Sequence, residues 1–139
     1  MEVILRRATK STPFVHLDRQ SSTYVIAGRS IPIDAEMFYQ PILNWLDGLL
    51  KDPPRLMEFH FHFDFFNIAS SKRILFILYK LAELQRAGVR VKVIWLYEKQ
   101  DDDTLEIGKD YEFMVDELCF EFVEFSTSDS EMSRVLKYG

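Results

Sequence analysis

The hydrophobic pattern changes its period within the stretch from Arg55 to Gly88, and this change most constrains the fold. Apolar and polar residues alternate from position 57 to position 65, which is typical of a strand buried on one face. The predicted inward residues are Met57, Phe59, Phe61, Phe63 and Phe65; the predicted outward residues are Glu58, His60, His62 and Asp64. From Arg73 the spacing becomes helical, and Gly88 stands where a helix C-cap is expected. The predicted inward residues of this helix are Ile74, Ile77, Leu78, Leu81 and Leu84.

The turn between this strand and this helix is Asn67-Ile68-Ala69-Ser70-Ser71, which is rich in small and polar residues. Such a turn places backbone N–H and hydroxyl groups at a helix N-terminus, where the helix dipole favours anions. We therefore expect a switch or a binding site of this molecule to lie here.

Strands and helices alternate along the rest of the chain. Phe14–Leu17 and Thr23–Gly28 are short β-type runs separated by turn residues, which predicts a hairpin. Asp34 is placed to cap a helix that ends before Pro53, and Pro41 inside its pattern predicts a late start or a kink. The predicted inward residues of that helix are Phe38, Ile42, Trp45, Leu46 and Leu49.

The second half predicts a strand at Val89–Tyr97, a helix capped by Asp103 or Thr104, and a final strand at Cys119–Phe125. The predicted apolar residues of that third helix are Leu105, Tyr111, Met114, Val115 and Leu118. The order β-β-α-β-α-β-α-β favours a single α/β domain with a mixed sheet of about five strands packed with helices. We expect residues 1–11 to be an arm or an edge strand, residues 12–125 to be the domain, and residues 126–139 to be a polar tail or a loose helix.

Composition limits the class of protein. The chain has 139 residues, of which 47% are hydrophobic and 14% aromatic, which is enough for one folded domain with a core. A net charge of -5 argues against nucleic acid as a partner, and a single cysteine, Cys119, excludes an internal disulfide. No long apolar run or signal peptide appears, so we expect a cytoplasmic protein without membrane insertion. No phosphate loop or nucleophile motif appears either, so we expect a non-enzyme without a cofactor.

The predicted order of elements is that of the STAS domains, and several short motifs make the resemblance more specific. These are Ser11-Thr12-Pro13, Gly28-x-Ser30-x-Pro32, Trp45, Phe66-Asn67-x-x-Ser70-x-Lys72, Val93-x-Trp95-x-Tyr97 and Glu106-x-Gly108-x-Asp110. With this ordered set, the chain resembles the SiaC-like regulatory phosphoproteins, which have a STAS-like fold. The resemblance extends from Ser11 to about Phe125.

The resemblance implies a partner-switching regulator. In that family a threonine in the turn is phosphorylated by a kinase and dephosphorylated by a PP2C-type phosphatase, and the unphosphorylated form binds and activates a diguanylate cyclase. Here Ile68 stands at the phosphothreonine position and cannot accept a phosphoryl group. Either Ser70 or Ser71 takes over the role, or the protein stays in the unphosphorylated form. The residues expected to bind the partner are Asn67, Ile68, Ser70, Ser71, Lys72, Phe76 and Tyr79.

Two simpler interpretations stand beside this one. Ser70 and Ser71 could be N-cap residues of the long helix. Phe76 and Tyr79 lie outside the inward stripe, which indicates either a helix buried on two sides or a surface for a partner.

The alternative function is that of a metal-binding protein or a metal-dependent enzyme. His60 and His62 lie on one face of a strand at a spacing that metal ligands use. A zinc site would need a third ligand, and nothing in the sequence marks one.

Overall fold

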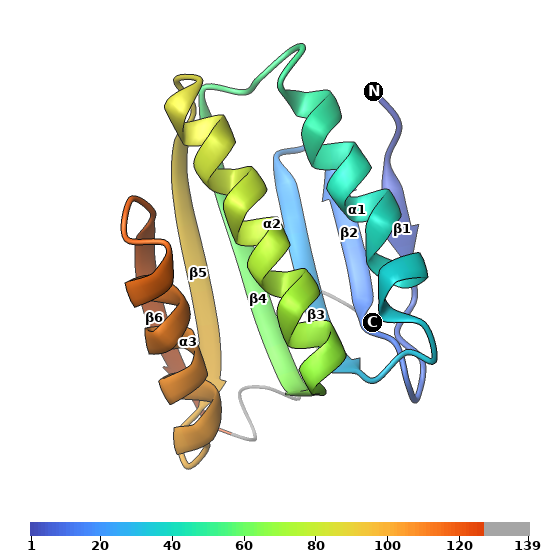
Figure 1. The fold of residues 1–139 in the computed structure, drawn as a ribbon, viewed down its shortest axis with the longest axis vertical. Helices are drawn as coiled ribbons and strands as arrows, with labels where there is room; N and C mark the ends of the chain where they lie inside the picture. Colours follow the sequence, from blue (N-terminus) through green and yellow to red (C-terminus); the bar gives the residue numbers. More distant parts are fainter. Residues whose placement is uncertain (127–139) are drawn as a thin grey trace.

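A six-stranded mixed sheet with three helices forms the protein in the computed structural model, which describes residues 1–126 (Figure 1). The strands are β1 (Ile4–Arg6), β2 (Phe14–Asp18), β3 (Thr23–Ser30), β4 (Leu56–Phe66), β5 (Arg90–Glu98) and β6 (Cys119–Phe125). The helices are α1 (Ala35–Leu49), α2 (Ile68–Arg86) and α3 (Asp102–Met114). The predicted α/β class with a mixed sheet is confirmed, with six strands instead of about five.

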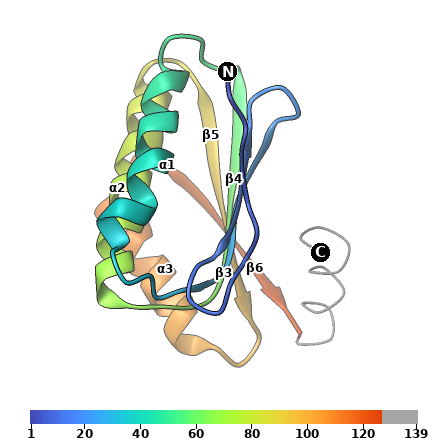
Figure 2. The same ribbon diagram turned by 90° about the vertical axis from the view of Figure 1, so that its right-hand side faces the viewer.

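The strands lie in the sheet in their order along the chain. β1, β2 and β3 pair antiparallel, whereas β3, β4, β5 and β6 pair parallel and are joined by the three helices. Each crossover adds the next strand on the same side, and crossovers share one hand, so all three helices are placed on one face. Figure 2 shows the helices on one side of the sheet and the other side without a helix from the described residues.

The core lies between this sheet face and the helices. Met57, Phe59, Phe61 and Phe63 of the central strand β4 are buried there, as predicted. The ring of Phe61 packs 4.8 Å from that of Phe59 and 5.6 Å from that of Trp95, centroid to centroid. The five predicted inward residues of α2 are also fully buried.

The prediction for Phe65 is wrong, because the strand changes its phase near its end. The pairing of β3 with β4 shifts between Gly28 and Arg29, whose partners are Phe63 and Phe65. After this bulge Phe66 takes the inward position, with its ring 5.0 Å from Phe63, and Phe65 is 52% exposed.

α1 begins where its sequence predicted, whereas α2 begins at Ile68, inside the predicted turn. Asp34 caps α1, since its carboxylate accepts the Met37 N–H at 3.0 Å. The helix begins at Ala35, so it does not start late, and Pro41 lies inside it. Of its predicted inward residues, Phe38 is half-buried and the other four are buried.

The cap of α3 lies earlier than predicted. Asp101 caps the helix, not Asp103 or Thr104, because its two carboxylate oxygens accept the Thr104 N–H at 3.0 Å and the Thr104 hydroxyl at 2.6 Å. Met114 is exposed and Leu105 half-buried, whereas the remaining predicted apolar residues of this segment are buried.

Two predictions concern the ends of the chain, residues 1–11 and residues 126–139. Residues 4–6 form an edge strand paired to β2, which decides between the arm and the edge strand expected for residues 1–11. The predicted tail lies outside the described residues except for Ser126. None of the described helices is long and apolar enough to cross a membrane.

Candidate partner-binding site

The candidate site lies where β4 ends and α2 begins. α2 begins at Ile68, and Asn67 is its N-cap: the side-chain oxygen of Asn67 accepts the Ser70 N–H at 2.9 Å. The Asn67 N–H donates to the Ser30 carbonyl at 3.1 Å, which holds the turn against the end of β3. The interpretation of Ser70 and Ser71 as N-cap residues is therefore wrong, because Asn67 already holds that position.

Ser70 belongs to a buried cluster of three hydroxyl groups. Its side chain is 0% exposed, and its hydroxyl donates to the Ser30 carbonyl at 3.1 Å and accepts from the Ser30 hydroxyl at 2.9 Å. The Tyr39 hydroxyl lies 2.6 Å from the Ser30 hydroxyl. Burial raises the pKa of Tyr39 above its usual range, so the phenol stays protonated and can donate to Ser30. Through these hydrogen bonds, the cluster holds the first turn of α2 against β3 and α1.

Ser71 faces the other side of the turn and is half-buried. Its hydroxyl donates to the Ile68 carbonyl at 2.7 Å, and its own carbonyl accepts the Tyr111 hydroxyl at 2.8 Å. Burial also raises the pKa of Tyr111, which keeps this donor protonated. α3 therefore holds the first turn of α2 from a second direction.

Apolar side chains are exposed around this fixed turn. Ile68, the first residue of α2, is 89% exposed, and Phe65 lies before it with the Arg29 guanidinium 5.7 Å from its ring centroid. Ile33, in the segment between β3 and α1, and Met37, in the first turn of α1, are also exposed. We name Ile33, Met37, Phe65 and Ile68 the apolar rim.

A shallow groove of about 400 Å³ runs between α1 and α2. Phe76, which packs partly on the core, and Tyr79, which is exposed, line it. The Arg73 guanidinium lies 5.4 Å from the Phe76 ring centroid, and the Lys72 ammonium lies 5.8 Å from it. Phe76 is therefore a packing residue and Tyr79 a surface residue.

Carboxylates lie on the opposite side of the rim. A hollow of about 370 Å³ between the end of β4 and the first turns of α3 is lined by Phe65, Phe66, Thr104 and Ile107 with the acidic residues Asp64, Asp101, Asp103, Glu106 and Asp110. Among the residues that the structure describes, Asp103, Glu106 and Asp110 form no ion pair. The surface next to Phe65 is therefore negatively charged.

Residues of several sequence motifs form close contacts in the structure. Gly28, with φ of +116°, lies beside Pro13, and the Ile31 N–H donates to the Ser11 carbonyl at 2.8 Å. Gly108 lets α3 approach β5, because a Cβ there would stand 2.5 Å from Nε1 of Trp95.

Sequence reasoning missed the apolar rim apart from Ile68, and it missed the roles of Tyr39 and Tyr111. Only structure pairs these phenols with groups of the turn, since Tyr111 lies 40 residues from Ser71. A signal for the rim existed in Ile33, an apolar residue between Pro32 and the cap Asp34, where no core position was expected.

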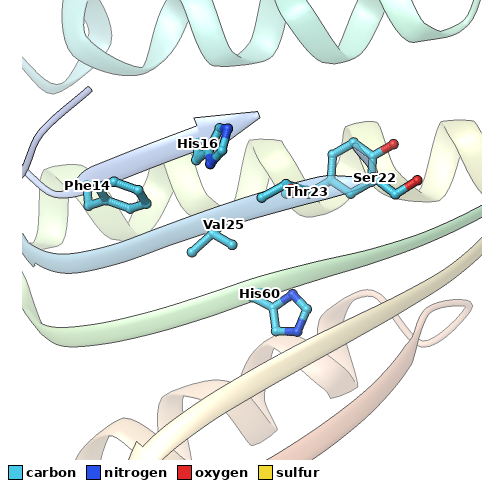
Figure 3. Close-up of a pocket in the computed structure, with 7 residues that line it drawn as sticks. Phe14, His16, Ser22, Thr23, Val25 and His60 are labelled. Atoms are coloured by element: carbon cyan, nitrogen blue, oxygen red, sulfur yellow. The ribbon is translucent and has the colours of Figure 1, made fainter. Parts of the chain in front are cut away.

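The two histidines of β4 have different surroundings on the helix-free face. His62 is 1% exposed, with its ring 4.5 Å from that of Phe125, whereas His60 is half-buried and lines a hollow together with His16 (Figure 3). No group of three or more metal-ligating side chains occurs within residues 1–126. The described part of the chain thus supplies no third ligand for a metal site at His60 and His62.

Comparisons with known proteins agree with this geometry. The chain matches the family model described as SiaC family regulatory phosphoprotein over residues 6–125. An uncharacterised protein of Pseudomonas aeruginosa (strain UCBPP-PA14) is 25% identical over 103 residues, which are 74% of this chain and 82% of that protein. The crystal structure of apo-SiaC from P. aeruginosa is similar with a TM-score of 0.78 and 23% identity, over 91% of this chain and 100% of that one. SiaC crystallised as the activator in complex with the diguanylate cyclase SiaD, also from P. aeruginosa, gives a TM-score of 0.81 and 22% identity, over 88% of this chain and 99% of that one. With a family match that spans most of the chain and the same fold, the protein belongs to the SiaC family of regulatory phosphoproteins.

Proposed function

We propose that this protein is a non-enzymatic signalling regulator that binds and activates a diguanylate cyclase. Membership in a family of regulatory phosphoproteins supports a regulatory role, and a structural relative forms a complex with a diguanylate cyclase as its activator. The partner docks at the apolar rim and the first turn of α2, and the acidic side chains beside Phe65 favour a partner surface with basic groups.

The observation that carries this proposal is the state of Ile68. An isoleucine that is 89% exposed at the start of a helix gains nothing from folding, but it gains about 2–3 kcal/mol when a partner buries it. The turn beneath it is held by Asn67, by the Ser70 cluster and by Tyr111. A rigid turn loses little conformational entropy on binding, so most of this gain is retained.

Control by phosphorylation is reduced in this chain. Ile68 offers no acceptor, and the Ser70 hydroxyl is fully buried with both of its hydrogen bonds inside the protein. Ser71 is the only remaining hydroxyl of the turn with any exposure, and it donates to the Ile68 carbonyl. The protein therefore stays in the binding-competent form, and a kinase and PP2C-type phosphatase pair would act on it through Ser71 alone.

Binding is tested with Ile68→Asp against the diguanylate cyclase of the same organism. The variant should fold, because an acidic residue in the first turn of a helix is favoured by the dipole. Docking must then desolvate a charge and lose an apolar contact, so the affinity should fall at least about tenfold, with a parallel loss of cyclic di-GMP synthesis.

The matched control is Phe113→Asp. It places the same charge on a similarly exposed apolar residue near the C-terminal end of α3, away from the turn that begins α2. It should leave the affinity unchanged. Equal affinities of all three proteins would place the interface away from the turn, and the absence of any binding by the parent protein would remove the cyclase as its partner.

Phosphorylation is tested separately by incubation with the organism's own kinase and intact-mass measurement. We expect no phosphate on residues 67–72 of the parent protein and one phosphate on an Ile68→Thr variant. A phosphate on Ser71 of the parent would show that control persists, and a phosphate on Ser70 would contradict its buried position.

A further inference from the structure

The outer edge of β6 is placed to accept a further strand. β6 is the last strand of the sheet, and among the described strands it pairs with β5 alone. This pairing covers all seven residues of β6 without a register shift. Figure 1 shows β6 at the outer side of the sheet, with β5 as its inner neighbour. An edge of this kind presents backbone N–H and C=O groups that can pair with another chain.

The two edges of the sheet differ in how they are protected. The opposite edge strand, β1, has only three residues and ends in Arg6. Proteins protect their sheet edges with short strands, bulges, proline or lysine. β6 uses none of these, because its sequence Cys-Phe-Glu-Phe-Val-Glu-Phe has neither proline nor lysine and its ladder is regular. Its charged residues are Glu121 and Glu124, so a strand that fits this edge must not set another carboxylate against them.

One hydrogen bond shows which residues of β6 turn their backbone groups outward. The Phe125 carbonyl accepts the Lys99 N–H at 2.8 Å, so the backbone groups of Phe125 point toward the β5 side. This direction alternates from residue to residue along a strand. The residues that turn their N–H and C=O groups to the open edge are therefore Phe120, Phe122 and Glu124.

These three residues are spaced so that β6 can pair with a second β6. In an antiparallel pair, opposite residues alternate between those that exchange two hydrogen bonds and those that exchange none. When two copies are centred on Phe122, Phe122 faces Phe122, and Phe120 faces Glu124 of the other copy. Each outward residue then meets another outward residue, so every open backbone group of the edge finds a partner. A two-fold axis relates the copies, which is the commonest symmetry of homo-oligomers.

The side chains suit the same register. Phe120 and Phe122 pack partly on the core, on the helix side of the sheet, with their ring centroids 5.8 Å apart. Facing Phe122 rings would continue this aromatic row across the boundary. No glutamate faces a glutamate, because Glu121 stands opposite Val123 of the other copy. The Lys92 ammonium, 3.9 Å from the Glu121 carboxylate, offsets that charge.

α3 brings a positive charge to the boundary. The Lys109 ammonium lies 4.0 Å from the Phe122 ring centroid. In the register above, Glu124 of the other copy is a diagonal neighbour of Phe122 on the same side of the sheet. Lys109 of each copy is therefore placed near a carboxylate of the other copy, which favours a second copy of this chain as the occupant of the edge.

The position of α3 is compatible with a second copy. This helix lies over β5 and β6, since a Cβ on Gly108 would stand 2.5 Å from Nε1 of Trp95 and 2.9 Å from the Phe122 ring. The two copies of α3 would then be about two strand spacings, or roughly 10 Å, apart. Packed helices have this separation, so the pairing brings α3 beside its copy without a clash.

We propose that this protein forms a two-fold symmetric dimer in which the β6 edges pair antiparallel around Phe122 and join two sheets into one. The occupant of the open edge is a second copy of this chain. This proposal does not depend on the proposed function, because β6 contains no residue of the apolar rim.

Sedimentation equilibrium and amide hydrogen exchange of the full chain test the dimer. We expect the dimer population to rise with protein concentration. The amides of Phe120, Phe122 and Glu124 should exchange at least about tenfold more slowly where the dimer predominates than where the monomer does. The amides of Val123 and Phe125, which point toward β5, should not share this dependence. A monomer at every concentration, or a dimer without protection of the three outward amides, would overturn the proposal.

Glu124→Pro tests the edge itself. Proline removes one outward N–H and is tolerated on an edge strand, so circular dichroism should stay unchanged while the dimer dissociation constant rises at least about tenfold. The matched control is Glu124→Ala, which removes the carboxylate but keeps the N–H. It should weaken the dimer only about two- to fivefold, because an exposed ion pair contributes little. Equal dissociation constants of the proline variant and the parent would place the contact elsewhere.

An exchange of charges gives a second test that does not depend on the proline variant folding. Glu124→Lys alone sets two ammonium groups near each other across the boundary and should weaken the dimer. Adding Lys109→Glu restores opposite charges and should return the dissociation constant to within about twofold of the parent. A double variant that binds no more tightly than Glu124→Lys alone would contradict the proposed register.

Discussion

The Ser70→Asp variant tests whether the first turn of α2 can accommodate a negative charge at the position of the buried hydroxyl. In the parent protein the Ser70 hydroxyl is fully buried, donates to the Ser30 carbonyl and accepts from the Ser30 hydroxyl. An ionised carboxylate cannot donate to that carbonyl, and it must fit where a smaller hydroxyl stood. Ser70→Asp should therefore destabilise the whole domain, not only the turn.

The magnitude follows from two losses. The Ser30 carbonyl loses a buried donor, which costs about 1–3 kcal/mol. Placing a charge out of water costs several kcal/mol more, even after relaxation and partial neutralisation. The free energy of unfolding should fall by at least ~3 kcal/mol at neutral pH, which is a large share of the ~5–15 kcal/mol that a domain has.

The measurement is urea unfolding followed by circular dichroism, with Ser71→Asp as the matched variant. Ser71 is half-buried in the same first turn, where a negative charge gains about 0.3–1 kcal/mol from the helix dipole. This gain offsets the lost hydrogen bond to the Ile68 carbonyl, so Ser71→Asp should stay within about 1 kcal/mol of the parent.

The pH dependence gives an independent check on the Ser70→Asp variant. Burial raises the pKa of the introduced carboxyl in the folded state above its unfolded value of about 3.9. The folded state then binds more protons than the unfolded state, so the deficit against the parent is largest at high pH and shrinks as the pH falls through the raised pKa. Equal stabilities of Ser70→Asp and Ser71→Asp, or a deficit that does not change with pH, would refute the reasoning.

Two further predictions concern the packing. Phe61→Ala should lower the free energy of unfolding by ~3–5 kcal/mol, because it opens a cavity beside Trp95, whereas Phe65→Ala, on the exposed side of the bulge, should cost below about 1 kcal/mol. Similar losses in urea unfolding would contradict the assignment of Phe66 and not Phe65 to the core. Gly108→Ala should cost about 1–3 kcal/mol and shift tryptophan fluorescence, because the new Cβ would stand 2.5 Å from Nε1 of Trp95. An unchanged emission spectrum would mean that α3 moves away freely.

The sequence predicted the parts of the fold that depend on periodicity. The alternation around Phe61 and the helical spacing from Ile74 to Leu84 each bury one face, so local pattern and final environment agree. Periodicity failed at Phe65, because a bulge depends on the register with Gly28 and Arg29, which are far away in the sequence. It also could not decide between an arm and an edge strand for residues 1–11, because the pairing of the three-residue strand β1 with β2 is a tertiary event.

The candidate site was predictable in position but not in chemistry. The change of period between Phe65 and Arg73 located the turn, but the sequence pointed to Ser70 and Ser71 as candidate N-cap residues and not to Asn67, which is the observed cap. The sequence did not distinguish Ser70 from Ser71, since both are serines in the same turn. Only the complete burial of Ser70 beside Ser30 and the partial exposure of Ser71 separate them.

The hydrogen bond from the Tyr111 hydroxyl to the Ser71 carbonyl restricts the local unfolding of the first turn of α2. The first turn of α2 is fastened to α1 through Tyr39 and Ser30, and to α3 through Tyr111. The three helices therefore share one anchor point, and that point lies directly beneath the exposed Ile68. Opening this anchor would break hydrogen bonds to α1, β3 and α3 together, so local unfolding of the turn should require a large share of the free energy of global unfolding. At the end of the protein that we propose to face the partner, a docking partner would then meet a rigid support and not a hinge.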